Sequence, residues 1–361
     1  MPDSGGTQAS MRAAERILGR PLTLVTTPTP LKGRNLNIVV QDSSCQRYFI
    51  KRLRDGEGSA GRMSILEDAQ GRLSRIPLPT PGLIGIDPAQ RLAVYEFSGG
   101  EPLPLVLKSG QDSDLLWADF GSVLGKLHSG GTEGLPATPR EVPRTGMDIL
   151  KEFSFEAFWS LSAAEVELWR ILQKAAADGR VDLDAHEVPA EPVLIHYDLR
   201  LDQALCVHDR VMLLDWEEMR SGDRARDLGM FFGDILSETV YGVLDNLDES
   251  DLAPDEAVGA LMISAGRRAS RAIGLVVDGY LTEFTSSRRV AELGHLKLLG
   301  RRVAHYMFRH LLERVGSRSA ISTQLTGIDR GIVAIALEIA QQLPAAANAF
   351  GFDFQARVQN A

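Results

Sequence analysis

The chain has 361 residues, of which 44% are hydrophobic and 24% are charged, and its formal net charge is −9 at pH 7. This length allows two sizeable cores, or one fold with two lobes. The acidic balance argues against general nucleic-acid binding, which needs a basic surface. No apolar stretch approaches the roughly 20 residues of a membrane span, and the N-terminus lacks the pattern of a signal peptide. The two cysteines fit no zinc or redox spacing, so we expect a cytoplasmic protein without a membrane or nucleic-acid partner.

The first hundred residues are rich in predicted strands. Residues 11–20 could form a short helix, and residues 21–53 then alternate between apolar and polar side chains as strands do. A helix is predicted over residues 59–76, because three prolines directly after residue 76 would end it. Two more strands are then predicted before a Ser-Gly-Gly loop at residues 98–100. We take this loop as the boundary between two lobes, residues 1–97 and residues 98–361.

Helical periodicity dominates after residue 112. Helices are predicted over residues 112–128 and 151–177, with a Gly- and Pro-rich connection at residues 129–146. Three or four more helices follow the central region. The pattern therefore predicts an α+β protein with a small N-terminal antiparallel β lobe that contains one helix, and a larger, mainly α-helical C-terminal lobe.

The central region, residues 195–229, combines acidic and amide side chains at spacings that phosphoryl transfer would use. Asp198 follows His196 by two residues and precedes Gln203 by five, and an apolar run then leads to a second carboxylate, Asp215. Transfer of a γ-phosphoryl group needs an oriented hydroxyl and divalent metal that neutralises charge on the phosphates. One aspartate would orient the hydroxyl, and the amide together with the second aspartate would bind the metal.

Several separated segments resemble one family. The central stretches HYDLRLDQAL and LLDWEEMRSGDRARDLG, the helix segment FGSVLGKLH and the N-terminal segment KGRNLNIVVQDSSCQRYFIKR together resemble the aminoglycoside phosphotransferase and choline kinase superfamily. The resemblance covers roughly residues 30 to 230. It implies a two-lobed protein-kinase-like fold, with ATP and Mg²⁺ as cofactors.

The resemblance assigns roles to the central residues. Asp198 would orient the acceptor hydroxyl or accept its proton, and Asp215 would bind Mg²⁺, which prefers carboxylate oxygen. Gln203 stands where the family generally has asparagine. Its longer side chain could still reach a metal, or it could hydrogen-bond the loop. Arg200, two residues after Asp198, would present a cation to the γ-phosphate, or be a solvated loop residue.

Nucleotide binding is expected in the N-terminal lobe. Lys51, in the strand segment FIKR, would pair with the α- and β-phosphates. Glu67, sixteen residues later in the predicted helix, would orient Lys51, with Asp68 as a possible substitute. The alternative is that Lys51 is an exposed strand lysine.

The adenine and phosphate contacts are less distinct in the sequence. Gly33 and Asn35 lie in the turn that would cover the nucleotide, although this turn has a single glycine and no G-x-G-x-x-G pattern. The backbone groups of Glu96 and Phe97 would bind the adenine edge, unless these residues simply end a strand.

Other polar residues are given structural roles. His196 is expected to brace the catalytic loop, and Asp223 and Asp227 to bind backbone amides near it. His128, at the end of a predicted helix, is expected to be packed in the interior.

The acceptor is left open by the sequence. The first hypothesis is an ATP-dependent kinase for a hydroxyl on a small molecule such as an aminoglycoside, an amino alcohol or a sugar. The second is a kinase that phosphorylates Ser or Thr of a ribosomally made precursor peptide, so that a partner lyase eliminates the phosphate. A pseudokinase scaffold is the third, and the presence of Lys51, Asp198 and Asp215 together argues against it.

Overall fold

A computed structural model describes residues 4–26, 35–54, 59–137, 154–181, 191–243, 254–287 and 293–360. The chain forms two compact units. The first unit comprises Met1–Glu101 and Gln203–Met219, and the second comprises Pro102–Asp202 and Arg220–Ala361. The predicted division at residue 97 did not include Gln203–Met219 in the first unit. The assignment of separate functions to the two predicted lobes stays a prediction.

The first unit is built on an antiparallel sheet of five strands. The strand order is β1-β2-β3-β5-β4, and neighbouring strands pair antiparallel throughout. The elements of this part are α1 (Ser4–Leu18), β1 (Thr23–Leu24), β2 (Asn35–Gln41), β3 (Arg47–Leu53), α2 (Ser59–Leu73), β4 (Leu83–Asp87) and β5 (Leu92–Glu96).

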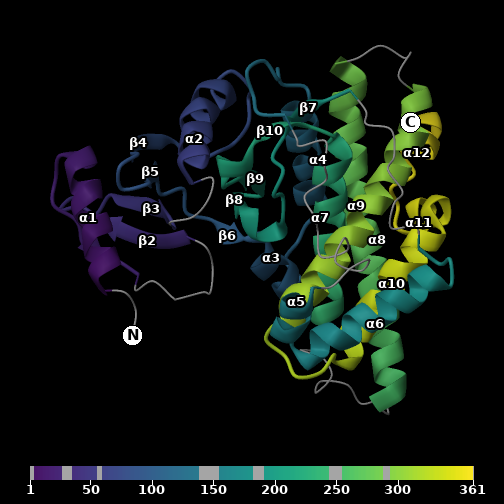
Figure 1. Ribbon diagram of the computed structural model, residues 1–361. Coiled ribbons are helices and arrows are strands. Elements are labelled where there is room, and N and C mark those ends of the chain that lie inside the picture. Colours follow the sequence, from purple (N-terminus) through teal and green to yellow (C-terminus); the bar gives the residue numbers. More distant parts are fainter. Residues whose placement is uncertain are drawn as a thin grey trace. The chain divides into compact units, whose positions relative to one another are not determined.

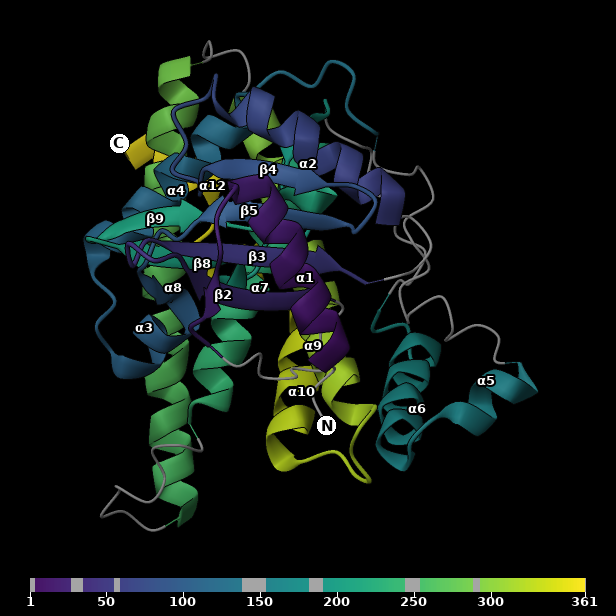
Figure 2. The same cartoon turned by 90° about the vertical axis from the view of Figure 1, so that its left-hand side faces the viewer.

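Helix α1 lies across one face of this sheet (Figure 2). Its buried alanines, Ala13 and Ala14, pack against the alternating apolar side chains of β2, β3 and β5 in one core cluster. The alternation explains why the strands are recognisable in the sequence, because every second side chain enters the core. The helix begins seven residues before the predicted position 11, since its first turns carry small and polar residues without apolar periodicity.

A short hairpin brings a distant part of the chain into the first unit. Strands β8 (Ala204–Val207) and β9 (Arg210–Leu213) pair antiparallel and form a three-stranded sheet with β6 (Glu101–Pro102). The turn residues His208 and Asp209 both have positive φ, as a two-residue hairpin turn requires. The Leu213 amide donates to the carbonyl of Pro79 at 3.1 Å. This main-chain bond ties the hairpin to the segment before β4.

The second unit is mainly helical (Figure 1). Its two-stranded antiparallel sheet pairs β7 (Val193–Ile195) with β10 (Arg220–Gly222). The short 3₁₀ helix η2 (Leu201–Gln203) leads out of this unit toward β8. The described helices are α3 (Leu103–Ser109), α4 (Asp114–His128), α5 (Phe155–Ser160), α6 (Ala163–Ala177), α7 (Arg224–Tyr241), α8 (Pro254–Ser287), α9 (Leu293–Ser319), α10 (Gly327–Gln341), α11 (Leu343–Ala349) and α12 (Phe354–Asn360).

Helices α4, α7, α8 and α9 form the core of the second unit. The rings of Phe120 in α4 and Phe231 in α7 stack with their centroids 3.7 Å apart. Gly121 allows α4 to approach α8 closely, because a Cβ at this position would lie 2.0 Å from the carbonyl oxygen of Val276. These contacts fix α7, which carries the two buried carboxylates Asp227 and Asp234 described below.

One predicted helix is divided in two. The sequence pattern predicted a single helix over residues 151–177, whereas the structure has α5 and α6 with a break at residues 161 and 162. Ser162 caps α6 through a capping box with Glu165, which competes with continuation of the preceding helix. Residues 138–153, which include the second half of the predicted connection, lie outside the described residues.

Among the described helices, no single one is both long and apolar enough to cross a membrane, and only the pair α10 and α11, bent by 117°, reaches that length and composition together.

Candidate active site

Lys51 lies at the centre of the first unit's sheet. It belongs to β3, between Asn37 of β2 and Ala93 of β5, and it is 4% exposed. Its ammonium group forms ion pairs with the carboxylates of Asp215 and Glu217. A buried ammonium is stable only when it is paired, so Lys51 is not the solvated strand lysine of the alternative interpretation.

Asp215 follows β9 after a single residue and turns sharply. Its φ is 64°, in the left-handed region that non-glycine residues rarely adopt. The amide of the preceding Leu214 donates to the carbonyl of Gln203 at 2.9 Å, so the hairpin brings the main chain of Gln203 next to Asp215. Gln203 itself is buried. The two residues predicted to bind metal are thus neighbours across the base of one hairpin.

Glu217 is a member of this cluster that the sequence analysis missed. It lies in the short helix η3 (Trp216–Glu218), and its carboxylate accepts a hydrogen bond from Asn35 Nδ2 at 3.1 Å. Burial and the nearby charge of Asp215 raise the pKa of Glu217, although Lys51 and Asn35 act in the opposite direction. Burial and the same two carboxylates also raise the pKa of Tyr95. Asn35, predicted to contact the nucleotide, therefore holds Glu217.

The predicted partner of Lys51 lies elsewhere. Glu67 is exposed on α2, and within the described part of the chain Lys51 pairs with Asp215 and Glu217 and not with Glu67. Asp68, the possible substitute, pairs with Arg72 one turn away. Helix α2 contacts the cluster's segment through a different residue, because Arg62 binds Glu218 at 2.7 Å.

The residues predicted to bind the base lie at the end of β5. Glu96 is exposed, and its amide donates to the carbonyl of Gly82 at 2.8 Å, so this N–H is already bonded within the protein. The ring of Phe97 lies 5.9 Å from the guanidinium carbon of Arg47. Gly33 lies outside the described residues, and nothing in the structure bears on its predicted role.

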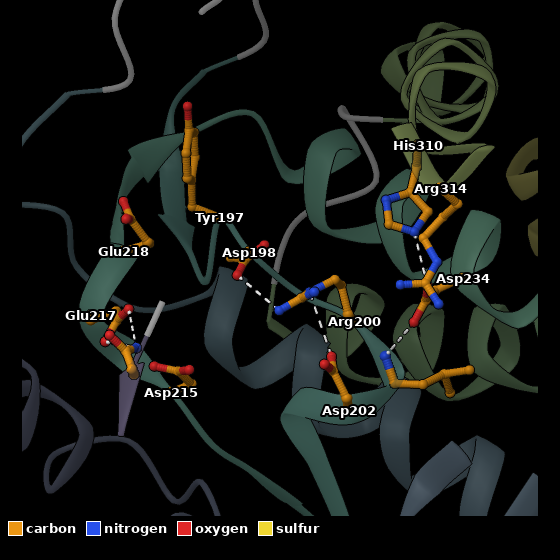
Figure 3. Close-up of polar contacts among 12 residues, drawn as sticks. Tyr197, Asp198, Arg200, Asp202, Asp215, Glu217, Glu218, Asp234, His310 and Arg314 are labelled. Atoms are coloured by element: carbon orange, nitrogen blue, oxygen red, sulfur yellow. Dashed lines mark hydrogen bonds and ion pairs between the residues drawn. The ribbon is translucent and has the colours of Figure 1, made fainter. Parts of the chain in front are cut away.

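In the second unit, Asp198 belongs to a segment that alternates between buried and accessible residues. Leu199 and Leu201 are fully buried, whereas the side chains of Asp198 and Asp202 are 44% and 55% exposed. Arg200 lies between the two carboxylates, with nitrogen–oxygen distances of 3.4 Å to Asp198 and 3.5 Å to Asp202 (Figure 3). The leucines anchor the segment, and the charged side chains project from it.

The start of this segment is held by Asp227 of α7. The two carboxylate oxygens accept the amides of His196 and Tyr197 at 2.7 and 2.8 Å, and Oδ2 also contacts His128 Nε2 at 3.2 Å. Burial alone would raise the pKa of Asp227, but the hydrogen bonds and the histidines lower it below its usual value. Burial lowers the pKa of His128, whose other ring nitrogen contacts the Tyr280 hydroxyl. The observed packing agrees with the structural roles predicted for Asp227 and His128.

Tyr197 adopts a left-handed backbone conformation between His196 and Asp198. Its φ is 76°, and guanidinium groups of Arg220 and Arg226 lie 3.6 and 3.8 Å from its ring centroid. Arg226 Nε also donates to the Tyr197 carbonyl at 2.9 Å. These contacts stabilise a conformation that is unfavourable for a bulky residue.

A model of the phosphotransferase enzyme family matches residues 27–260, which is more than half of the chain. This range includes the Lys51 cluster and the segment that bears Asp198. The chain belongs to this family. The predicted relationship to phosphotransferases is thereby confirmed. No curated protein sequence matches the chain.

Solved structures share the fold of this phosphotransferase-family chain at low sequence identity. An amicoumacin kinase in complex with AMP-PNP, Ca²⁺ and Ami has a TM-score of 0.52 and 12% identity, with 99% of this chain and 100% of that chain covered. A putative fructosamine-3-kinase from Thermobifida fusca has a TM-score of 0.50 and 18% identity, with 92% and 98% covered. A choline/ethanolamine kinase family protein from Mesorhizobium loti has a TM-score of 0.50 and 16% identity, with 97% and 99% covered. These similarities support the predicted α+β, protein-kinase-like fold class.

The donor set of the phosphotransferase's first unit suits nucleotide and Mg²⁺. Within the described residues, no group of three or more His, Cys, Asp or Glu side chains is arranged to hold a metal ion. Mg²⁺ in phosphoryl-transfer sites usually takes one or two protein carboxylates, together with phosphate and water oxygens. The Asp215 carboxylate and the Gln203 amide oxygen would be ligands of this kind, and Lys51 would be a cation for phosphate oxygens.

Proposed function

We propose that this phosphotransferase-family protein is an ATP- and Mg²⁺-dependent kinase that transfers the γ-phosphoryl group to a hydroxyl of a small molecule. The observation that supports it most directly is the ion pairing of buried Lys51 with Asp215, which are 164 residues apart in the sequence. A lysine that binds phosphates beside an aspartate that binds metal is the combination that phosphoryl transfer needs on the nucleotide side.

Asp198 has the chemistry required on the acceptor side. Its carboxylate is accessible and pairs with Arg200, and a carboxylate of this kind can orient a hydroxyl and accept its proton. In the proposed step, the acceptor oxygen bonds to the γ-phosphorus while the bond from that phosphorus to the β–γ bridging oxygen breaks. The hydroxyl proton passes to Asp198, and ADP leaves. Mg²⁺, when bound, would neutralise charge on the phosphates.

Arg200 and Gln203 have supporting roles in this proposal. Arg200 holds the Asp198 carboxylate on one side and Asp202 on the other, so its guanidinium is available to developing charge on the transferred group only at the expense of these contacts. Gln203 would bind metal through its side-chain oxygen. One substitution tests each role, and substitution of Arg200 also removes a contact of the Asp198 carboxylate.

The family and the named neighbours support a small-molecule acceptor. The family is one of phosphotransferases, and the structural neighbours above are named as kinases of amicoumacin, of fructosamine, and of the choline/ethanolamine kinase family. A small hydroxyl compound is therefore the first acceptor class to test. A precursor peptide has no support from the family match or from these neighbours.

The test is a screen of acceptors read by mass spectrometry. The purified protein would be incubated with ATP and Mg²⁺ and with aminoglycosides, macrolides, amino alcohols, sugars, fructosamines and Ser/Thr peptides. We expect one small-molecule class to gain a phosphate group. Asp198→Asn should lower the rate of transfer by about 100-fold or more and leave nucleotide binding intact.

Asp202→Asn is the matched control for this test. It removes the charge of the other carboxylate that Arg200 contacts, in the same segment and at similar exposure. The proposal requires that Asp198→Asn lowers transfer far more than Asp202→Asn does. Phosphorylation or dehydration of peptides alone would favour the peptide kinase. Tight nucleotide binding without transfer to any acceptor would favour a scaffold.

A further inference from the structure

Helix α7 carries a second buried carboxylate, which holds the other end of the Asp198 segment. Asp234 is 2% exposed and lies seven residues after Asp227. Because seven residues make almost two turns of an α-helix, the two carboxylates share one face of α7. Asp234 Oδ2 accepts the amide of Leu201 at 2.8 Å. Asp198 therefore lies between two main-chain attachments to α7, one on each side.

Two side chains of α9 hold Asp234 in turn. His310 Nε2 lies 3.0 Å from Asp234 Oδ1, and Arg314 Nε lies 3.4 Å from the same oxygen. His310 is 3% exposed, and it is one helical turn away from Arg314. Arg314 also pairs with Glu238 of α7. The carboxylate thus has charged or polar partners on both of its oxygens.

The close approach of α9 to α7 is built into the sequence of α7. A Cβ at Gly233 would lie 3.0 Å from Cδ2 of His310, and a Cβ at Gly229 would lie 2.5 Å from the carbonyl oxygen of Val303. Glycine at these two positions, one turn apart, brings α9 close enough for His310 to reach the residue next to Gly233. The contact between Asp234 and His310 is therefore a feature of the helix pair and not of flexible surface side chains.

The buried carboxylate of Asp234 needs these polar contacts to stay ionised. Removing an ionised carboxylate from water is costly unless hydrogen bonds or opposite charge replace the lost hydration. Burial alone would raise the pKa of Asp234, but the hydrogen bond from His310 and the charges of His310 and Arg314 lower it. Asp234 is thereby kept ionised, and an ionised carboxylate is a stronger acceptor for the Leu201 amide than a neutral one.

We propose that Asp234 and His310 are positioning residues for Asp198, and that α9 thereby contributes to the rate of phosphoryl transfer without contacting the reacting atoms. The amide of Leu201 is three residues from Asp198, and the side chains of Leu199 and Leu201 are fully buried. With both ends of the segment attached to α7, the main chain that carries Asp198 has little freedom to move. A misplacement of about 1 Å can lower a rate on the order of 100-fold, so a small loss of this attachment is measurable.

The test uses two substitutions in the full-length protein. His310→Phe removes the nitrogen that contacts Asp234 and keeps an aromatic ring of similar size, whereas His310→Gln retains a polar group that can donate to the carboxylate. Hydrogen exchange would be read at single-amide resolution for Leu201 and, as an internal reference, for Tyr197, which Asp227 holds. Arg330→Gln is the matched control, because it breaks an exposed ion pair with Glu167 in the same unit.

His310→Phe is expected to accelerate exchange of the Leu201 amide while the Tyr197 amide is unchanged. We expect kcat to fall on the order of 10-fold, less than a 1 Å misplacement costs, with an unchanged KM for ATP. His310→Gln should restore most of both quantities, and Arg330→Gln should change neither. Unchanged exchange at Leu201, equal acceleration at both amides, or an unchanged kcat despite faster exchange would each overturn the proposal.

The inference rests on the proposed function for its effect on rate, and on the hydrogen bonds alone for its effect on the segment. If the unsubstituted protein transfers phosphate to no acceptor, the proposed function fails, and exchange at Leu201 still decides whether His310 holds the segment. If transfer is observed and His310→Phe leaves kcat unchanged, the proposed function stands and the positioning role fails.

Discussion

The cluster around Lys51 and the segment around Asp198 are held in place by different kinds of contact. In the first unit, Lys51, Asp215, Glu217 and Asn35 contact one another through side chains. In the second unit, the segment that bears Asp198 is attached through its main-chain amides to carboxylates of α7. The first arrangement depends on the balance of charge, whereas the second depends on the helix beneath it.

This difference has consequences for single substitutions. A change of charge in the Lys51 cluster leaves the remaining charges facing one another in a partly buried environment, where they are poorly screened. A change of the Asp198 side chain leaves the segment's main-chain bonds intact. Stability and activity should therefore change together in the first unit and separately in the second.

The largest effect is expected from Lys51→Met. The substitution keeps most of the apolar stem but leaves Asp215 and Glu217 without their shared cation. We expect transfer to fall by about 100-fold or more and the free energy of unfolding to fall by about 3 kcal/mol. Kinetics and denaturant unfolding would measure both. Lys126→Met, at a half-exposed ion pair with Glu283 in the second unit, is the control. Full activity of Lys51→Met would contradict a phosphate-binding role.

Asp227→Asn should show that in the second unit the residue that holds the main chain affects stability, whereas Asp198 affects the rate of transfer. An amide oxygen cannot replace two carboxylate oxygens that together accept the amides of His196 and Tyr197 and contact His128. We expect the free energy of unfolding to fall by about 2 kcal/mol. Asp198→Asn, at an accessible position, should change it by less than about 0.5 kcal/mol, although we expect it to lower transfer by about 100-fold or more. Equal losses of stability in the two variants would remove the distinction between the two residues.

The sequence predicted those parts of the site that depend on local spacing. Asp198, Gln203 and Asp215 lie within one motif, and the structure places the main chain of Gln203 beside Asp215. Lys51 was predicted from its strand and is buried as a paired lysine. The catalytic and metal-binding roles of these residues stay predictions, since geometry alone does not test them.

Contacts between distant segments were not accessible from the sequence. Asn35 and Glu217 are 182 residues apart, and Asp234 and His310 are 76 residues apart, so no local spacing joins either pair. Glu67 was favoured as the partner of Lys51 because it lies in the next helix. Tertiary packing instead turns its side chain to solvent. The only sequence signal for Asp234 was its position seven residues after Asp227 on one helix face.

A direct comparison of two glutamates would sharpen the account of the first unit. Glu217→Gln retains a hydrogen-bond acceptor for Asn35 but removes one of the two charges that face Lys51. We expect ATP affinity or kcat to change on the order of 10-fold. The reason is that a hydrogen bond to a charged group, such as that between Lys51 and Glu217, contributes about 1.5 kcal/mol, which corresponds to about a tenfold change. Glu67→Gln, at an exposed position, should leave both within about twofold.

These two variants give opposite results under the alternative assignment. If Glu67 orients Lys51 during turnover, Glu67→Gln would lower kcat and Glu217→Gln would not. Isothermal titration with an ATP analogue, followed by steady-state kinetics, distinguishes the two. A double variant shows whether the two glutamates act on the same lysine, because the effects of substitutions at residues that share one partner are not additive.

The smallest expected effect is a dependence of stability on pH that comes from His128. Burial lowers the pKa of His128, so the unfolded chain takes up a proton below about pH 6.5, where the folded chain does not. The free energy of unfolding should therefore decrease as pH falls below 6.5, by at most about 1.4 kcal/mol per pH unit from this group. The loss should stop once the pH passes below the folded-state pKa. Denaturant unfolding between about pH 7.5 and about pH 5.5, one unit above and one unit below the ordinary pKa of histidine, would measure the slope.

His128→Gln isolates this contribution from the other histidines. Because glutamine does not titrate, the difference in slope between the two proteins reports His128 alone. His208→Asn is the control, since His208 is exposed in a left-handed turn and asparagine tolerates that conformation. A slope that is the same with and without His128 would mean that His128 takes up its proton equally in both states. In that case the contact with Asp227 would become an ion pair below about pH 6.5, and there the first attachment of the Asp198 segment would depend on charge, as the Lys51 cluster does.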